Sequence, residues 1–154
     1  MKLGFVSSIL DQSHYEEMMD AASSMGFSCV EVACWPAGKA ERRYAGVSHI
    51  DVDRVLANDA YVNHVLSYAK ERNVQISSLA FYPNTMDGNL EKRNAAITHL
   101  HKLIKASARL GVNMVTTFIG RDQTKTIEEN LELVREIWPP IHRSGKRSRC
   151  TCGN

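Results

Sequence analysis

The stretch AASSMGFSCVEVACWP, residues 21–36, contains the pattern that decides the fold of this 154-residue chain. Small residues with helical preference lead to Gly26, a residue type that readily adopts the left-handed conformation closing a helix. A short apolar run rich in strand-forming residues follows at 29–34, and a polar loop comes after it. We therefore expect a helix, a tight turn and then a buried strand.

The same pattern occurs twice more along the chain. YAKERNVQISSLAFYPN, residues 68–84, turns at Asn73, and ASARLGVNMVTTFIGRD, residues 106–122, turns at Gly111. Asparagine and glycine both accept the left-handed conformation. A further apolar run precedes the first unit. Strands are therefore expected at 3–6, 29–34, 75–81 and 114–119.

Apolar residues recur at helical spacing between and after these expected strands. The periodicity predicts one helix capped by Asn58 or Asp59 and a longer one that starts near Leu90. A further helix is expected to begin at Thr126, because Glu129 three residues later completes a capping box.

Strands that alternate with helices in this way predict an α/β fold with a parallel sheet. Four strand–helix units form either a small doubly wound sheet or half of an eight-stranded barrel. The segment FVSSILDQS, residues 5–13, lacks the glycine-rich phosphate-binding pattern of dinucleotide-binding folds. The periodicity alone leaves both architectures open.

Composition and charge exclude several classes of protein. A hydrophobic content of 44% with 23% charged residues is typical of a globular domain. The net charge of +2 is too small to indicate nucleic-acid binding. No apolar run approaches the roughly 20 residues of a membrane span, and the first residues become polar too early for a secretory signal. Cys29 and Cys34 flank an expected buried strand, which favours reduced thiols in the cytoplasm.

Four short segments are informative in combination: VEVACWP (30–36), HIDVD (49–53), LAFYPN (79–84) and TFIGRD (117–122). Together they resemble the sugar phosphate isomerase/epimerase family. This family has the xylose isomerase-like TIM barrel and is related to AP endonuclease family 2. The resemblance runs from residue 2 to about residue 141 and implies a (β/α)8 barrel truncated to about its first four β/α units. Residues 1–141 are accordingly interpreted as the N-terminal half of a TIM barrel.

The resemblance also implies a metal-dependent sugar or sugar-phosphate isomerase or epimerase. Full-length members of the family are expected to use a divalent metal (Mn, Mg, Co or Zn) bound by acidic and histidine residues on strands five to eight. Four strands contain none of those positions, so we assign no catalytic residue and no metal ligand here. The chain alone is expected to bind no cofactor and to be inactive. The expected ligand of the complete enzyme is a sugar or sugar phosphate.

The end of the chain departs from the family pattern. The last helix is expected to end near Pro139 and Pro140, since proline disrupts a helix interior. Residues 142–154, HRSGKRSRCTCGN, are basic and have no apolar period, and we interpret them as an aberrant tail that is frameshifted or disordered. Back-translation from Ile141, read one base later, permits STAQENGVAVPVE. That sequence resembles a helix end, a turn and a strand with a terminal glutamate, which favours the frameshift.

Five residues are candidates for substrate binding because barrel chemistry gathers at the C-terminal ends of the strands. Glu31 is an acid inside an apolar run, Trp35 and Tyr82 are aromatic residues with polar tips, and Asn84 follows the third strand. Arg121 follows the fourth strand and suits a phosphate or carboxylate group. The structural alternatives are a buried ion pair for Glu31 and core or lid packing for Trp35 and Tyr82. For Arg121 the alternative is an ion pair with Asp122 or a neighbouring loop. The same positional rule selects Ser7 and Asp122.

The remaining histidines and aspartates are interpreted without a functional role. His49, Asp51 and Asp53 alternate, and helix capping by the aspartates with a solvated His49 is the preferred account over a metal site. The other histidines interpreted as surface residues are His64, His99 and His101.

Two alternative functions stay open at this point. One is an endonuclease-IV-like phosphodiesterase on the same barrel, which would need histidines after the third and fourth strands. The segments there read FYPN and IGRD. The other is a non-enzymatic half-barrel that forms a homodimer, because the apolar outer strands at 3–6 and 114–119 would lack a pairing partner. We expect neither a nucleic acid nor a membrane as a partner of this chain.

Overall fold

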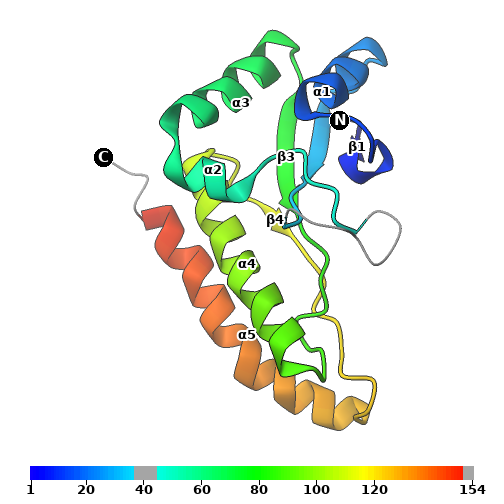
Figure 1. Ribbon diagram of the computed structural model, residues 1–154, viewed down its shortest axis with the longest axis vertical. Helices are drawn as coiled ribbons and strands as arrows, with labels where there is room; N and C mark the ends of the chain where they lie inside the picture. Colours follow the sequence, from blue (N-terminus) through cyan, green and yellow to red (C-terminus); the bar gives the residue numbers. More distant parts are fainter. Residues whose placement is uncertain (37–44, 151–154) are drawn as a thin grey trace.

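The computed structural model describes residues 1–36 and 45–150 of the chain (Figure 1). In this part, parallel strands alternate with helices. The elements are β1 (Gly4–Val6), the 3-10 turn η1 (Ser7–Ile9), α1 (Tyr15–Ser24), β2 (Cys29–Ala33), α2 (Val52–Ala57), α3 (Asp59–Glu71), β3 (Gln75–Ala80), α4 (Leu90–Arg109), β4 (Val115–Thr116) and α5 (Ile127–Cys150).

The strands form one sheet in the order β1-β2-β3-β4, and every neighbouring pair is parallel. Glu31 of β2 lies opposite Ser78 of β3. This confirms the predicted α/β fold with a parallel sheet. β4 is shorter than the strand expected at 114–119, because only Val115 and Thr116 pair with β3.

The two faces of the sheet differ in burial. Val30 and Val32 of β2 are fully buried in the same core cluster as Met18 of α1 and Leu103 of α4. Complete burial of a valine side chain contributes about 1.5–3 kcal/mol. Because side chains alternate along a strand, Glu31 between them belongs to the opposite face. That face is therefore available to carry polar groups.

The predicted turns between helices and strands are confirmed. Gly26, Asn73 and Gly111 all have positive φ angles, of 77°, 53° and 67°. Each stands between a helix and the strand that follows it. The left-handed conformation at these positions ends the helix and directs the chain back along the sheet.

The predicted helix caps are confirmed as well. The side chain of Asn58 accepts a hydrogen bond from the backbone N–H of Tyr61 at 3.1 Å. The Thr126 backbone N–H donates to the Glu129 carboxylate at 2.8 Å, and the Glu129 N–H donates to Thr126 Oγ1 at 3.2 Å. Asp51 caps α2 in the same way. Each cap pairs backbone groups that the first helical turn would otherwise leave unbonded.

The predicted helix end at Pro139 and Pro140 is wrong. α5 continues through both prolines, and Figure 1 shows it along the length of α4. A proline in a helix interior costs about 3 kcal/mol. Packing against α4 opposes this cost, since Ile141 is only 3% exposed within the main core. Residues 142–150, part of the segment interpreted as a tail, continue the helix, and residues 151–154 lie outside the described residues.

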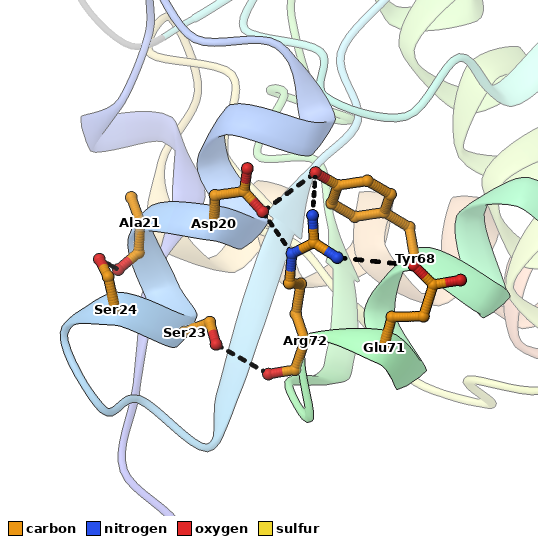
Figure 2. Close-up of polar contacts among 7 residues, drawn as sticks. All are labelled: Asp20, Ala21, Ser23, Ser24, Tyr68, Glu71 and Arg72. Carbon is orange, nitrogen blue, oxygen red and sulfur yellow. Dashed lines mark hydrogen bonds and ion pairs between the residues drawn. The ribbon is translucent and has the colours of Figure 1, made fainter.

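A polar cluster links α1 to α3 near the start of the strands (Figure 2). Arg72 Nε donates to Asp20 Oδ1 at 2.6 Å, and its NH2 group donates to the Tyr68 hydroxyl at 2.8 Å. That hydroxyl in turn donates to Asp20 at 3.0 Å, and Ser23 Oγ donates to the Arg72 carbonyl at 2.9 Å. The guanidinium group holds the pKa of Asp20 below its usual value. The cluster fixes the ends of both helices before the chain enters β2 and β3.

We predict that Gly4→Ala destabilises the protein by about 1–3 kcal/mol, through overpacking. A methyl group at this position would lie 2.3 Å from the Cys29 carbonyl oxygen and 2.7 Å from its sulfur. Urea unfolding followed by far-UV circular dichroism measures the change. Gly145→Ala is the control, because nothing lies within 4 Å of its added methyl group. In a helix interior, that control is expected to gain about 0.5–1 kcal/mol. Equal stability of the two variants would contradict the close packing of β1 against β2.

Candidate functional site

The candidate site lies where the parallel strands end, since their carboxyl ends meet at one edge of the sheet. Its centre is the carboxylate of Glu31, on the face opposite the helices. Ser78 Oγ donates to Glu31 Oε2 at 2.9 Å, and the Tyr82 hydroxyl donates to Oε1. Strand register brings Glu31 and Ser78 together, and Tyr82 follows β3 by two residues. The structure therefore brings two of the five predicted residues into direct contact.

An aromatic pair borders this carboxylate. The ring of Tyr82 lies 4.6 Å from that of Phe118, centroid to centroid, at an interplanar angle of 42°. Burial and then the hydrogen bond to Glu31 raise the pKa of Tyr82 above its ordinary value. The phenol therefore stays protonated and continues to donate at neutral pH. An ionised carboxylate has about four lone-pair positions, so two remain to accept hydrogen bonds from a ligand.

Trp35 packs in a second aromatic group. Its ring packs edge-on against Phe81 at 4.9 Å and 82°, and Phe81 packs edge-on against His99 of α4 at 4.6 Å and 72°. Trp35 is half-buried, with its contacts directed toward the core. It lies two residues after the end of β2.

Asn84 and Arg121 meet through a main-chain contact. Asn84 Nδ2 donates to the carbonyl oxygen of Arg121 at 2.8 Å, while Oδ1 accepts from the Met86 N–H at 3.1 Å. Thr85 Oγ1 also donates to the Ile119 carbonyl at 2.7 Å. These bonds join the loop after β3 to the loop after β4. The Arg121 side chain itself is exposed and forms no ion pair with any acidic group of the described residues.

Ser7 and Asp122, which the same positional rule selected, each bond to one main-chain group and one side chain. The Ala33 N–H donates to Ser7 Oγ at 2.8 Å, and Ser7 is fully buried. The Asp122 carboxylate accepts from both the hydroxyl and the N–H of Thr124, at 2.7 and 3.0 Å. These bonds hold the pKa of Asp122 below its usual value. Both side chains therefore organise loops.

The predictions that His49 is solvated and that His99 is a surface residue are wrong. His49 is 4% exposed and lies 2.9 Å from Ser7 Oγ through Nδ1. His99 is 9% exposed, and its Nε2 donates to the Cys34 carbonyl at 2.8 Å. Desolvation by burial is the main cause that lowers the pKa of each. His64 is exposed as predicted and pairs with Glu16, whereas His101 is half-buried.

Sequence reasoning missed Ser78 and Phe118 as members of the site. Ser78 had a detectable signal, because it is a polar residue inside the strand QISSLA. A register that shifts between Val30 and Glu31 decides that Ser78 is the residue opposite the acid. Neither the shift nor the position of Phe118 can be read from local periodicity.

Two kinds of feature are absent from residues 1–36 and 45–150. No three histidine, cysteine, aspartate or glutamate side chains there gather in a way that could hold a metal ion. No helix in the same residues is both long enough and apolar enough to cross a membrane.

The two buried histidines predict that stability decreases in mild acid. Their folded-state pKa values lie below the ordinary 6.5, so the unfolded chain binds protons first as the pH falls. The stabilisation is complete above pH 6.5 and is lost as the pH falls from 6.5 to the lowered pKa. Each histidine contributes a slope of at most about 1.4 kcal/mol per pH unit.

Urea unfolding at a series of pH values between 8 and 5 measures this slope. His99→Gln is expected to reduce it, whereas the exposed control His64→Gln should retain it. An equal slope in wild type and His99→Gln would contradict a neutral, buried His99.

Comparison with curated proteins gives no match for this chain. Solved structures do match. A D-psicose 3-epimerase with D-tagatose from Clostridium cellulolyticum H10 is 19% identical, with a TM-score of 0.57, covering 94% of this chain and 50% of that one. An IolI protein with a bound zinc atom is 14% identical, with a TM-score of 0.65 and coverages of 97% and 49%.

A candidate xylose isomerase from Rhodospirillum rubrum ATCC 11170 is 16% identical, with a TM-score of 0.67 and coverages of 96% and 51%. The chain thus spans about half the length of the solved structures it matches. At these identities the likeness concerns the fold. The family described as "Xylose isomerase-like TIM barrel" matches residues 19–147. The chain therefore belongs to the xylose isomerase-like TIM barrel family.

Proposed function

We propose that this chain forms the substrate-binding part of a sugar or sugar-phosphate isomerase or epimerase. The main observation behind the proposal is the position of the Glu31 carboxylate. Ser78 and Tyr82 donate hydrogen bonds to it on the face of the sheet opposite the helices, near the carboxyl ends of the strands. Carboxylates that retain free lone pairs recognise sugar hydroxyl groups well. Two of the similar structures are of epimerases that act on D-psicose, one with D-tagatose and one with D-fructose, which supports a ketose as the ligand class.

Each predicted site residue receives a role in this proposal. Glu31 and Tyr82 bond to sugar hydroxyls, and the Tyr82–Phe118 pair contacts an apolar face of the ring. Arg121 binds a phosphate group on a phosphorylated substrate. Asn84 positions the Arg121 main chain through its 2.8 Å hydrogen bond. Trp35 borders the site at the end of β2.

A divalent metal is expected for the full-length family, and a zinc atom is present in one similar structure. The residues described here do not fit a metal on their own. Glu31 is the acid at the centre of the site, and hydroxyl donors already bind both of its oxygens. A catalytic zinc site typically has three protein ligands, and no three histidine, cysteine, aspartate or glutamate side chains of the described residues gather in that way. We therefore propose that metal ligands and acid–base groups come from outside these four strands, so that the 154-residue chain binds sugar without turnover.

The other readings have less support. A phosphodiesterase of the endonuclease IV kind needs histidines after β3 and β4, and residues 81–84 and 117–122 contain none.

A cytoplasmic location is proposed from the free thiols of Cys29 and Cys34, which suit a reducing compartment.

Titration of the chain with D-fructose or D-tagatose, followed by amide chemical shifts, tests the proposal. We expect weak binding with shifts near Glu31, Ser78 and Tyr82, and no product when manganese, cobalt or magnesium is added. Glu31→Gln should weaken binding roughly tenfold, or about 1.4 kcal/mol. Glu128→Gln, an exposed carboxylate in α5, is the control. Equal affinity of both variants, or metal-dependent turnover by this chain, would contradict the proposal.

Arg121 is tested by repeating the titration with a ketose phosphate. Arg121→Ala should weaken binding of the phosphorylated sugar and leave the free sugar and the melting temperature unchanged. A lowered melting temperature with unchanged binding would instead assign Arg121 to the stability of the fold.

We also propose that the chain forms a homodimer. β1 and β4 each have one strand neighbour among the described residues, so each has an unpaired edge. Apolar side chains are exposed along those edges and on the face of the sheet opposite the helices. They are Leu3, Val6, Met114, Phe118 and Ile119. Pairing of β4 with β1 of a second copy, twice over, would give an eight-stranded two-fold assembly that covers them.

Light scattering at micromolar concentration should therefore give about twice the mass of one chain. Phe118→Lys should shift the equilibrium toward monomer, because it places a charge on the covered face. Ile127→Lys is the control, since Ile127 is exposed at the start of α5, away from the strand edges. A cooperatively melting monomer that binds no hydrophobic dye would instead indicate an open α/β domain.

A further inference from the structure

We infer that His49 and His99 are positioning residues that fix Trp35 at the end of β2. The two histidines lie on opposite sides of the segment 33–35, and each forms a hydrogen bond to a main-chain group of that segment. The role of Trp35 in sugar binding rests on the proposed function. The positioning itself rests only on the contacts described below.

His49 acts through a defined chain of hydrogen bonds. The Ala33 N–H donates to Ser7 Oγ at 2.8 Å, and Ser7 Oγ lies 2.9 Å from His49 Nδ1. His49 Nε2 lies 3.1 Å from the Leu10 carbonyl, which can only accept, so Nε2 carries the proton. In the neutral ring Nδ1 is then an acceptor, and the Ser7 hydroxyl donates to it. Each donor in this series of hydrogen bonds therefore faces an acceptor.

The main chain around His49 completes this side of the contact. The His49 N–H donates to the Ala33 carbonyl at 2.9 Å, and the Trp35 N–H donates to the Val47 carbonyl at 3.2 Å. Cys34 and Ser48 form an antiparallel bridge between these two bonds. Residues 47–49 thus run beside 33–35 as a short antiparallel extension of β2. His49 attaches that extension to the end of β1 through Ser7.

His99 acts from α4 on the other side. Its Nε2–H donates to the Cys34 carbonyl at 2.8 Å. Its ring contacts Phe81, and Phe81 contacts the Trp35 ring, both edge-on at centroid distances of 4.6 and 4.9 Å. One imidazole therefore fixes the peptide before Trp35 and supports the ring that packs against its indole.

The chemistry of these two sites explains why histidine is present instead of an apolar residue. Leucine would fill similar volume but would leave the Cys34 carbonyl without this donor and the Ser7 hydroxyl without its acceptor. An unpaired buried polar group costs about 1–3 kcal/mol, so the segment would shift to find new partners. Glutamine at position 99 keeps an N–H donor on a side chain of comparable length. The two substitutions separate a hydrogen-bonding role from simple filling of space.

The test follows the indole of Trp35 in a Trp138→Phe background, which leaves one tryptophan in the chain. Trp138 suits removal because its buried Nε1 has no hydrogen-bond partner among the described residues. We expect His99→Leu and His49→Leu to red-shift the Trp35 emission and to raise its acrylamide quenching about twofold, as the segment opens locally. His99→Gln should restore the parent signal. His64→Leu, at an exposed histidine, is the control.

Ser7→Ala provides a milder variant if either leucine substitution prevents folding. It removes the hydroxyl that joins His49 to the Ala33 N–H, and it should change Trp35 quenching in the same direction with an unchanged far-UV spectrum. Unaltered Trp35 signals in the folded variants would overturn the inference, as would a His99→Gln signal equal to that of His99→Leu. These measurements contain no sugar. Failure of the sugar titration would therefore refute the proposed function and leave the positioning role intact.

Discussion

The parallel pairing of β2 with β3 is the constraint on which the rest of this structure depends. The register shifts between Val30 and Glu31, so that Ser78 lies opposite the acid and Ala80 opposite Ala33. Because Ala33 and Ala80 are the last residues of β2 and β3, the two strands end side by side. A one-residue slip would exchange the two faces of β2, which would expose Val30 and bury the Glu31 carboxylate among the helices. The core and the candidate site are thus specified by the same set of strand contacts.

Features that depend on a few neighbouring residues could be predicted from the sequence. The turns at Gly26, Asn73 and Gly111 and the capping box of Thr126 with Glu129 were of this kind. Their hydrogen bonds join residues at most six positions apart, so the local sequence contains the whole interaction. The strand–helix alternation followed from them. The resemblance of four short segments to a known family then chose the barrel over an open sheet, and the match over residues 19–147 supports that choice.

Features that depend on distant contacts were predicted poorly. The local preference of Pro139 and Pro140 predicted a helix end, but α5 continues through both prolines, with Ile141 packed in the main core. The burial of His99 could have been predicted. It lies three residues after Ala96 and four before Leu103, both buried on the same helix face. The hydrogen bond to Cys34, by contrast, joins residues 65 positions apart and leaves no local trace.

The hydrogen-bond partners of the polar side chains distinguish the structural residues from the candidate binding residues. Asn84, Asp122 and His99 bond chiefly to main-chain groups or within their own loop, and replacing those bonds with a ligand would leave loop backbone unsatisfied. The Glu31 carboxylate accepts hydrogen bonds from the hydroxyls of Ser78 and Tyr82, side chain to side chain. Such a cluster can exchange partners with a sugar hydroxyl without breaking any backbone pairing. That difference, rather than position at the end of a strand, makes Glu31 and Tyr82 the strongest candidates for the proposed substrate binding.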